Sequence, residues 1–347
     1  MQNASRDGTF LGREAAEAEA VARRLALRLA PVLPGLVARL RAHPPAVVAT
    51  CARGSSDHAA TFGKYVLERA VGLPVASLGP SLASVYGGTP ALAGALFIAV
   101  SQSGRSPDTL RLTEAARAGG ALVAVMLNDE TAPLAALADV LLPLAAGPEH
   151  SVAATKSFLA AGLAFLHLAA AWSGDPALAA AVAAAPDALA AAGDRDWGPA
   201  LSNLHAARSL YVIGRGPGLG IALEMALKLK ETCGIHAEAF SAAEVLHGPM
   251  ALVGPGFPVL VLDPGDEGGA STLDTAGRLA AVGATVLYAG RDPAPGWTAL
   301  PLPQGTPAAL LPLLQARAFY GGLAPLAAAR GLDPDTPPHL RKVTRTV

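Results

Sequence analysis

Two carboxylates and a lysine recur at helical spacing in one short segment of the chain. Glu224, Lys228 and Glu231 are separated by four and three residues, so they share one face of a helix predicted from about Gly218 to Thr232. A carboxylate held beside an ammonium group can move a proton between two carbons of a substrate. The same spacing also produces ordinary ion pairs on a solvated helix face, so the pattern alone leaves both interpretations open.

A glycine-rich turn precedes this helix. The apolar run from Ser209 to Ile213 indicates a strand, and Gly214-Arg215-Gly216-Pro217-Gly218 follows it. Backbone N–H groups in such a turn can approach a phosphate. Two histidines, His236 and His247, lie downstream of the helix. The segment therefore combines an anion-binding turn with groups that titrate.

The pattern of strand, glycine turn and helix occurs twice. Gly54 and Gly216 are 216 − 54 = 162 positions apart, and Gly265 lies 265 − 103 = 162 positions beyond Ser103. Apolar runs keep this register over residues 46–51, 95–100, 121–127 and 138–144 in the first half and 209–213, 258–262, 284–288 and 298–302 in the second. We predict two copies of one α/β unit, each with about five parallel strands covered by helices on both sides.

A second polar constellation follows the strand that ends near residue 100. Its hydroxyl and amide side chains are Ser101, Gln102, Ser103 and Ser106. In open α/β sheets ligands bind at the carboxyl ends of the strands, and the N-terminus of the next helix favours an anion. The serines predict a site for a phosphate monoester, although Ser106 and Asp108 could instead be ordinary helix caps. Arg105 could contact the phosphate or point to solvent.

Composition limits the function. The 347 residues are 52% hydrophobic with a net charge of −1, which favours buried parallel strands and excludes nucleic acid as a partner. Cys51 and Cys233 are predicted to be inert core thiols of a reducing compartment. No cluster of residues has the spacing of metal ligands, and no nicotinamide-binding fingerprint follows the first strand. We expect neither a metal nor an organic cofactor.

The sequence predicts a cytoplasmic protein with no membrane partner. The first residues lack the order of a secretory signal peptide. The apolar run 158–172 is shorter than the roughly 20 residues that a membrane span needs, so we interpret it as a buried helix. The alanine-rich run 177–192 is interpreted as a helical linker between the two units.

Several segments together resemble the double SIS-domain sugar-phosphate proteins. The chain is most similar to the SIS-type glucosamine-6-phosphate deaminases and to the isomerase half of glutamine–fructose-6-phosphate aminotransferase. The segments that carry the resemblance are residues 52–56, 101–109, 152–158, 222–249 and 340–344, which include ALKLKE, HAEAF and HGP. The resemblance implies two tandem SIS domains, each a five-stranded parallel sheet in a three-layer, flavodoxin-like αβα arrangement. The expected boundaries are an N-terminal helical segment at 1–34, SIS domains at 35–175 and 198–330, a linker at 176–197, and a tail at 331–347 that closes the active site.

The resemblance also implies roles for individual residues. Glu231 would carry the proton between C1 and C2 of the open-chain sugar, which suits a carboxylate whose pKa is raised by partial burial. His247 would open the sugar ring, and Lys342 matches the tail lysine that forms a Schiff base or closes over the site. Glu224 and Lys228 would support Glu231. The phosphate would be held by Ser55, Ser56, Ser101, Gln102, Ser103 and Ser106.

The N-terminal sequence favours the release of ammonia over its incorporation. The aminotransferases carry a glutamine-hydrolysing domain with an N-terminal cysteine, whereas this chain begins Met1-Gln2 and has no cysteine before Cys51. We therefore expect an enzyme that deaminates glucosamine 6-phosphate to fructose 6-phosphate and ammonia. The alternatives are action on galactosamine 6-phosphate, deglycation of a phosphorylated fructosyl-amine and, more remotely, a non-catalytic phosphosugar sensor. The resemblance further implies a homodimer in which His247 acts in the partner's site.

Overall fold

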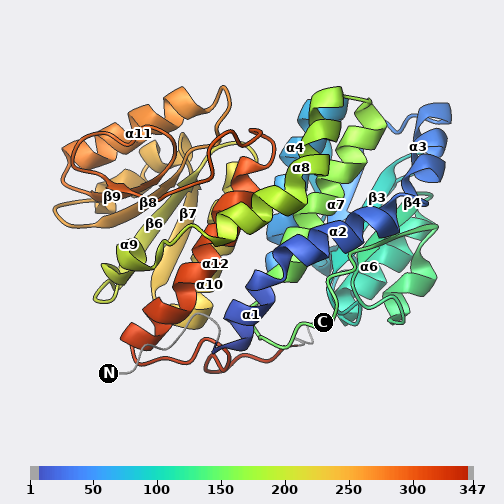
Figure 1. The fold of residues 1–347 in the computed structure, drawn as a ribbon. Coiled ribbons are helices and arrows are strands. Elements are labelled where there is room, and N and C mark those ends of the chain that lie inside the picture. Colours follow the sequence, from blue (N-terminus) through green and yellow to red (C-terminus); the bar gives the residue numbers. More distant parts are fainter. Residues whose placement is uncertain (1–7, 343–347) are drawn as a thin grey trace. The chain divides into compact units, whose positions relative to one another are not determined.

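The computed structural model describes residues 8–342 as two compact units. The first-repeat unit comprises residues 20–149, 156–184 and 341–342 of the described chain, and the second-repeat unit comprises residues 8–19, 150–155 and 185–340. The chain therefore enters and leaves each unit more than once. Figure 1 shows the helices and strands of both, coloured along the sequence.

The first-repeat unit is built on a five-stranded parallel sheet. The strand order is β2-β1-β3-β4-β5, and neighbouring strands pair in parallel throughout. Strands with both faces buried read as continuous apolar runs, which explains why the sequence signals are long and do not alternate. The strands are β1 (Val48–Cys51), β2 (Val75–Ser77), β3 (Leu96–Ser101), β4 (Leu122–Leu127) and β5 (Val140–Pro143).

Helices cover both faces of this sheet. One face packs against α6 (Pro107–Ala118), with α5 (Ser81–Ser84) and η1 (Pro133–Leu137) beside it. The other face packs against α4 (Ser55–Val71), which contacts α7 (Lys156–Ser173). α3 (Leu33–Ala42) packs on α7, and α2 (Ala18–Leu29) precedes it in the chain.

The second-repeat unit repeats this architecture. Its parallel sheet has the order β10-β9-β8-β6-β7, which is the order of the first sheet with each strand replaced by its repeat partner. α11 (Gly269–Ala281) packs on one face, and α10 (Gly218–Cys233) packs on the other beside α12 (Leu311–Ala329) (Figure 1). The strands are β6 (Ser209–Gly214), β7 (His236–Ser241), β8 (Pro258–Leu262), β9 (Thr285–Ala289) and β10 (Thr298–Ala299). The remaining elements are α1 (Phe10–Ala16), α9 (Gly198–Ser202), η2 (Glu244–Leu246) and η3 (Pro249–Leu252), and α8 (Pro176–Gly193) connects to this unit.

The predicted fold class is confirmed. Both sheets are parallel and five-stranded, and the helix expected from about Gly218 to Thr232 is α10, which ends one residue later. Each sheet has one strand more than the four apolar runs recognised in the sequence, β2 in the first and β7 in the second. These strands leave a weak sequence signal because β2 has only three residues and most of β7 is not fully buried. The expected domain boundaries stay predictions.

Within residues 8–342, two helices are long and apolar enough to cross a membrane by length and composition alone. In α7, 78% of the apolar window is buried within the protein, as expected for a core helix. The prediction of a buried helix over 158–172 is therefore confirmed. α8 is the other helix, and only 28% of its alanine-rich window is buried.

Candidate functional site

A cavity of about 340 Å³ lies at the carboxyl ends of β1 and β3 in the first-repeat unit. This is the edge at which open α/β sheets bind ligands. Hydroxyl, amide, guanidinium and ammonium groups line the cavity, so it suits an oxyanion. Its lining residues are Arg53, Gly54, Ser56, Val100, Ser101, Gln102, Ser103, Ser106, Thr109 and Lys342.

Two local features shape the loops of this cavity. Gly54 has φ 54° and ψ −133°, a conformation that residues with a side chain rarely adopt, and it turns the chain from β1 into α4. Ser101 Oγ accepts a hydrogen bond from the Gly104 backbone N at 2.9 Å, which fixes the loop after β3. Ser106 is the N-cap of α6 but makes no side-chain cap bond, so the helix-cap alternative is wrong for this residue.

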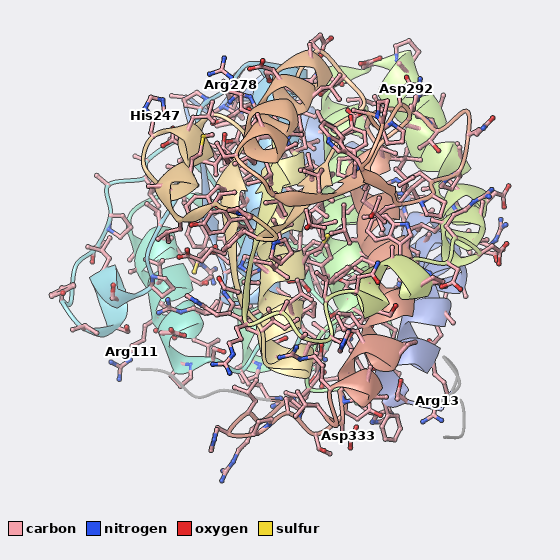
Figure 2. All side chains as sticks on the ribbon, turned by 90° about the vertical axis from the view of Figure 1, so that its left-hand side faces the viewer. Arg13, Arg111, His247, Arg278, Asp292 and Asp333 are labelled. Carbon is pink, nitrogen blue, oxygen red and sulfur yellow. The ribbon has the colours of Figure 1, made fainter. Side chains whose placement is uncertain are left out.

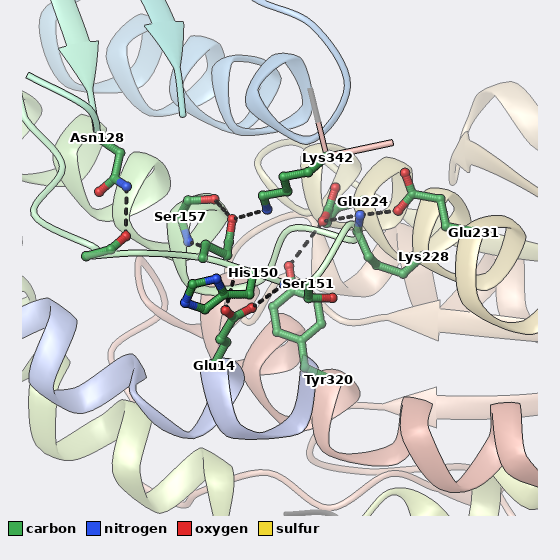
Figure 3. A network of polar contacts seen from close by, with 12 residues as sticks. Glu14, Asn128, His150, Ser151, Ser157, Glu224, Lys228, Glu231, Tyr320 and Lys342 are labelled. Atoms are coloured by element: carbon green, nitrogen blue, oxygen red, sulfur yellow. Dashed lines mark hydrogen bonds and ion pairs between the residues drawn. The ribbon is translucent and has the colours of Figure 1, made fainter. Parts of the chain in front are cut away.

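Lys342 is held in the cavity by a buried carboxylate. Its Nζ donates to Glu149 Oε2 at 2.9 Å. Ser157, at the start of α7, donates to the same carboxylate with its backbone N at 3.1 Å and its hydroxyl at 2.6 Å (Figure 3). Three donors therefore converge on Glu149, and the lysine that the resemblance places in the active site has a defined position.

Arg53 lines the cavity, whereas Arg105 does not. Arg105, which we considered as a phosphate ligand, forms an exposed ion pair with Asp129 at 2.8 Å and does not line the cavity. Arg53 lines it and was not predicted as a site residue. Its position directly before the Gly54 turn was the available sequence signal.

The carboxylate and lysine cluster predicted on α10 is real, and it is buried. Glu224 and Lys228 are both 0% exposed, so the solvated-face interpretation is wrong. Lys228 Nζ lies 3.5 Å from Glu224 Oε1 and donates a hydrogen bond to Glu231 Oε2. Tyr320 of α12 donates its hydroxyl to Glu224 at 3.2 Å (Figure 3). The helix face that carries these charges thus packs inside the unit, as does the face of Ala222, Ala226 and Leu229.

Glu231 is the member of this cluster that can reach a ligand. Its side chain is 17% exposed and borders a cavity of about 600 Å³ between the end of α10 and residues 331–340. Lys228 fixes one oxygen of the Glu231 carboxylate through its hydrogen bond. The arrangement presents an oriented carboxylate beside a buried ammonium group, which is suited to proton transfer.

The remaining predicted residues lie apart from these cavity linings. His247 follows η2 and is exposed, and Figure 2 shows its side chain projecting outward. Ser56 lines the cavity of the first-repeat unit, whereas Ser55, the first residue of α4, does not. The structure therefore gathers Ser56, Ser101, Gln102, Ser103, Ser106 and Lys342 at one cavity and Glu224, Lys228 and Glu231 in one cluster.

The two cysteines are buried free thiols, as predicted. Burial, and after it the charge of Asp108, raise the pKa of Cys51 to about 12. Burial also raises the pKa of Cys233 to about 11. Within residues 8–342, no three His, Cys, Asp or Glu side chains are grouped so that they could hold a metal ion.

Comparison with known proteins identifies relatives that match most of the chain. The chain is 38% identical over 317 residues to the isomerizing glutamine–fructose-6-phosphate aminotransferase of Aeropyrum pernix, which covers 83% of this chain and 49% of that protein. The chain thus spans about half the length of the curated relatives it matches.

Solved structures share the fold over nearly the full chain. A proposed phosphosugar isomerase from Silicibacter pomeroyi is 44% identical with a TM-score of 0.89, covering 94% of this chain and 100% of that one. A glucosamine-6-phosphate deaminase from Thermotoga maritima shares the fold with a TM-score of 0.75 at 22% identity, covering 97% and 100%.

The SIS domain family matches both halves of the sequence, over residues 47–171 and 203–288. These two stretches contain the two parallel sheets apart from β10 and the last residue of β9. They also contain the loops after β1 and β3, whose side chains line the first cavity, and all of α10 with its buried cluster. The chain is a member of the SIS domain family, with two copies of the domain.

Proposed function

We propose that this protein is a phosphosugar aldose–ketose isomerase that releases ammonia, with glucosamine 6-phosphate as its substrate. The observation that carries the proposal is the cavity at the ends of β1 and β3, where serine hydroxyls are combined with Arg53 and Lys342. Hydroxyl and cationic donors at the carboxyl edge of a parallel sheet suit a phosphate monoester. The kinship with the aminotransferase and with phosphosugar isomerases supports a sugar as the esterified group.

The proposed reaction consumes one water and needs no oxidant or reductant. His247 assists opening of the pyranose ring by proton exchange, for which imidazole is suited near neutral pH. Glu231 removes the proton from C2, and the enolamine is protonated at C1 to give the imine of fructose 6-phosphate. Water adds to C2 of the imine, the C–N bond breaks, and fructose 6-phosphate and ammonia leave.

Lys228 and Glu224 support the base in this scheme. The hydrogen bond from Lys228 orients the Glu231 carboxylate, Glu224 pairs with Lys228 from the other side, and Tyr320 donates its hydroxyl to Glu224. Lys342 is assigned to closing the site over the phosphosugar, with Glu149 holding its ammonium group. A Schiff base on Lys342 would require the amine to lose its proton and leave Glu149.

We propose release of ammonia as the direction because hydrolysis of the imine needs only water. Incorporation would need a supply of ammonia, and a thiolate is the usual nucleophile for taking it from glutamine. Both cysteines in this chain are buried and their pKa values are raised, so neither is suited to that role. The free thiols also agree with a cytoplasmic location, which we retain as part of the proposal.

The test of this function is ammonia release by the purified protein. Glucosamine 6-phosphate, galactosamine 6-phosphate, a fructosyl-amine 6-phosphate and glucose 6-phosphate are supplied in parallel. Ammonia with equimolar fructose 6-phosphate from the first compound alone supports the proposal. Ammonia from galactosamine 6-phosphate, or amine release from the fructosyl-amine, would establish the corresponding alternative. Binding of phosphosugars without turnover of any would indicate a sensor.

We also propose a homodimer in which His247 serves the partner's active site. The exposed position of His247 after η2 supports this, because the side chain is available to a second copy. Subunits carrying Glu231→Gln are mixed with subunits carrying His247→Ala, and activity is measured after exchange. Recovery of activity above either inactive parent is expected. No recovery in a mixture shown to contain mixed dimers would contradict action in trans.

A further inference from the structure

Arg53 occupies a position from which its guanidinium can reach a ligand. It stands between β1 and the Gly54 turn, and its side chain is 50% exposed while lining the cavity. The family resemblance assigns hydroxyl side chains to this site and does not include Arg53. Its role therefore has to be argued from the contacts that it makes.

A buried carboxylate holds the Arg53 guanidinium in one orientation. Arg53 Nε and Nη2 lie 2.8 Å and 2.7 Å from Asp108 Oδ2, and the Asp108 side chain is 0% exposed. The other carboxylate oxygen, Oδ1, accepts from the Thr109 backbone N at 2.7 Å, which fixes Asp108 on the first turn of α6. Since a guanidinium group has about five N–H donors in a planar fork, Asp108 leaves about three of them for a ligand.

Charge in the cavity depends on Arg53. Its described lining includes two cations, Arg53 and Lys342, and no carboxylate. Both cations are paired with a carboxylate, Lys342 with Glu149 and Arg53 with Asp108, but the planar guanidinium of Arg53 still has N–H donors for a phosphate dianion. Arginine is suited to this because its planar donors match two phosphate oxygens at once.

We propose that Arg53 binds the phosphate group of the substrate and that Asp108 is the residue that positions it. The inference rests on the proposed function in one respect, which is that the cavity takes a phosphate ester. Arg53 adds a charged group of fixed orientation to a site for which the sequence had indicated mainly serine hydroxyls. Arg53 would thereby favour phosphorylated over uncharged sugars.

Arg105 provides a matched control for this proposal. It belongs to the loop after β3, its side chain is also 50% exposed, and its Nη2 is also paired with an aspartate at 2.8 Å. It differs in lying outside the cavity lining. A long-range charge effect should appear in both arginines, whereas direct binding should appear only in Arg53.

The experiment measures the dissociation constant of inorganic phosphate by calorimetry. Loss of a charged hydrogen bond predicts that Arg53→Gln weakens phosphate binding by about 10- to 100-fold, while Arg105→Gln changes it by less than about threefold. Arg53→Lys keeps the charge and should give an intermediate value. Equal phosphate affinity in Arg53→Gln, Arg53→Lys and the parent protein would overturn the proposal, as would equal losses at Arg53 and Arg105.

The positioning role of Asp108 needs its own test, because removing a buried carboxylate can also disturb folding. Asp108→Asn is measured alone and combined with Arg53→Gln, with thermal melts confirming that each variant is folded. If Asp108 acts through Arg53, its substitution weakens phosphate binding only when Arg53 is present. Tighter binding in Asp108→Asn, or the same loss in both backgrounds, would contradict positioning.

The two proposals fail differently. If the protein releases no ammonia from any amino sugar but Arg53→Gln still weakens phosphate binding, the deaminase function fails and the Arg53 site stands. If ammonia is released and phosphate affinity does not depend on Arg53, the function stands and this inference fails.

Discussion

The two repeats have the same sheet order and different chemistry at the same edge. In the first repeat, the strands β1 and β3 end in loops whose hydroxyls and cations line a cavity. In the second repeat, the corresponding strand β8 ends at Leu262 and is followed by Asp263, which stands 263 − 101 = 162 residues after Ser101. The first repeat therefore carries an uncharged serine, Ser101, where the second repeat carries the carboxylate of Asp263.

The acidic loop of the second repeat satisfies its own hydrogen bonds. Asp263 accepts from the Gly265 backbone N at 2.9 Å and from the Tyr288 hydroxyl at 3.2 Å. Burial and then the charge of Asp263 raise the pKa of Tyr288. Asp266 accepts from the Gly268 backbone N at 2.9 Å. The loop after β8 is therefore suited to a structural role, and its carboxylates would repel a phosphate.

The repeats also differ in the helix that follows the glycine turn. The helix α10 of the second repeat buries the Glu224 and Lys228 charges and presents Glu231, whereas α4 of the first repeat begins at the edge of the cavity that follows β1 and β3. The two repeats thus share a scaffold and differ in their loops and on one helix face. Under the proposed function, the first repeat would bind the phosphate and the second would supply the base.

The largest effect is expected from removing the proposed base. Glu231→Gln keeps the size of the side chain but cannot accept a proton, so kcat should fall by about 10²- to 10⁴-fold. Inorganic phosphate binding at the first repeat should be unchanged, which calorimetry measures. Glu238→Gln, at an exposed position on β7, is the matched control. Loss of phosphate affinity together with turnover would show that Glu231 has a structural role.

A second substitution tests the difference between the two repeats by introducing an aspartate into the first. Ser101→Asp places in the first repeat the residue that the second carries at the same register position. A carboxylate beside a bound phosphate should weaken binding by about 10- to 100-fold, because the two like charges repel each other. Ser101→Asn has similar size without the charge and should lose much less. Similar losses in the two variants would mean that shape, and not charge, distinguishes the repeats.

The sequence predicted the scaffold better than the site. Buried parallel strands leave continuous apolar runs, so β3 and β8 could be placed within a residue or two, whereas the short edge strand β2 leaves little signal. The α10 constellation was visible because its spacing is local. The burial of this constellation was not visible in the sequence, because Tyr320, which packs against Glu224, is 96 residues away in the chain. Arg53 was overlooked for the same reason, since Asp108, its positioning partner, is 55 residues distant.

A smaller effect is expected from the carboxylate that holds the tail lysine. Glu149→Gln replaces the charge on which Lys342 and Ser157 converge, so a charge-assisted hydrogen bond is lost and kcat/KM should fall by about tenfold. Glu130→Gln alters a partly exposed pair with Arg28 and serves as the control. Both variants are measured by steady-state kinetics and thermal melts. A lowered Tm in Glu149→Gln with unchanged kcat/KM would assign Glu149 to stability alone.

The smallest effects are expected from alanine substitutions in the two glycine turns. Gly54 and Gly216 have φ values of 54° and 53°, and a Cβ at either position would meet no atom within 4 Å. Alanine therefore introduces backbone strain without a clash, and each substitution should lower the free energy of unfolding by about 1 to 3 kcal/mol. Because Gly54 lines the phosphate cavity, only Gly54→Ala should also weaken phosphate binding, by a few fold at most. Chemical unfolding and calorimetry measure the two quantities. If Gly216→Ala weakened phosphate binding as much as Gly54→Ala, the second turn would share the anion site, and the division of tasks between the repeats would be wrong.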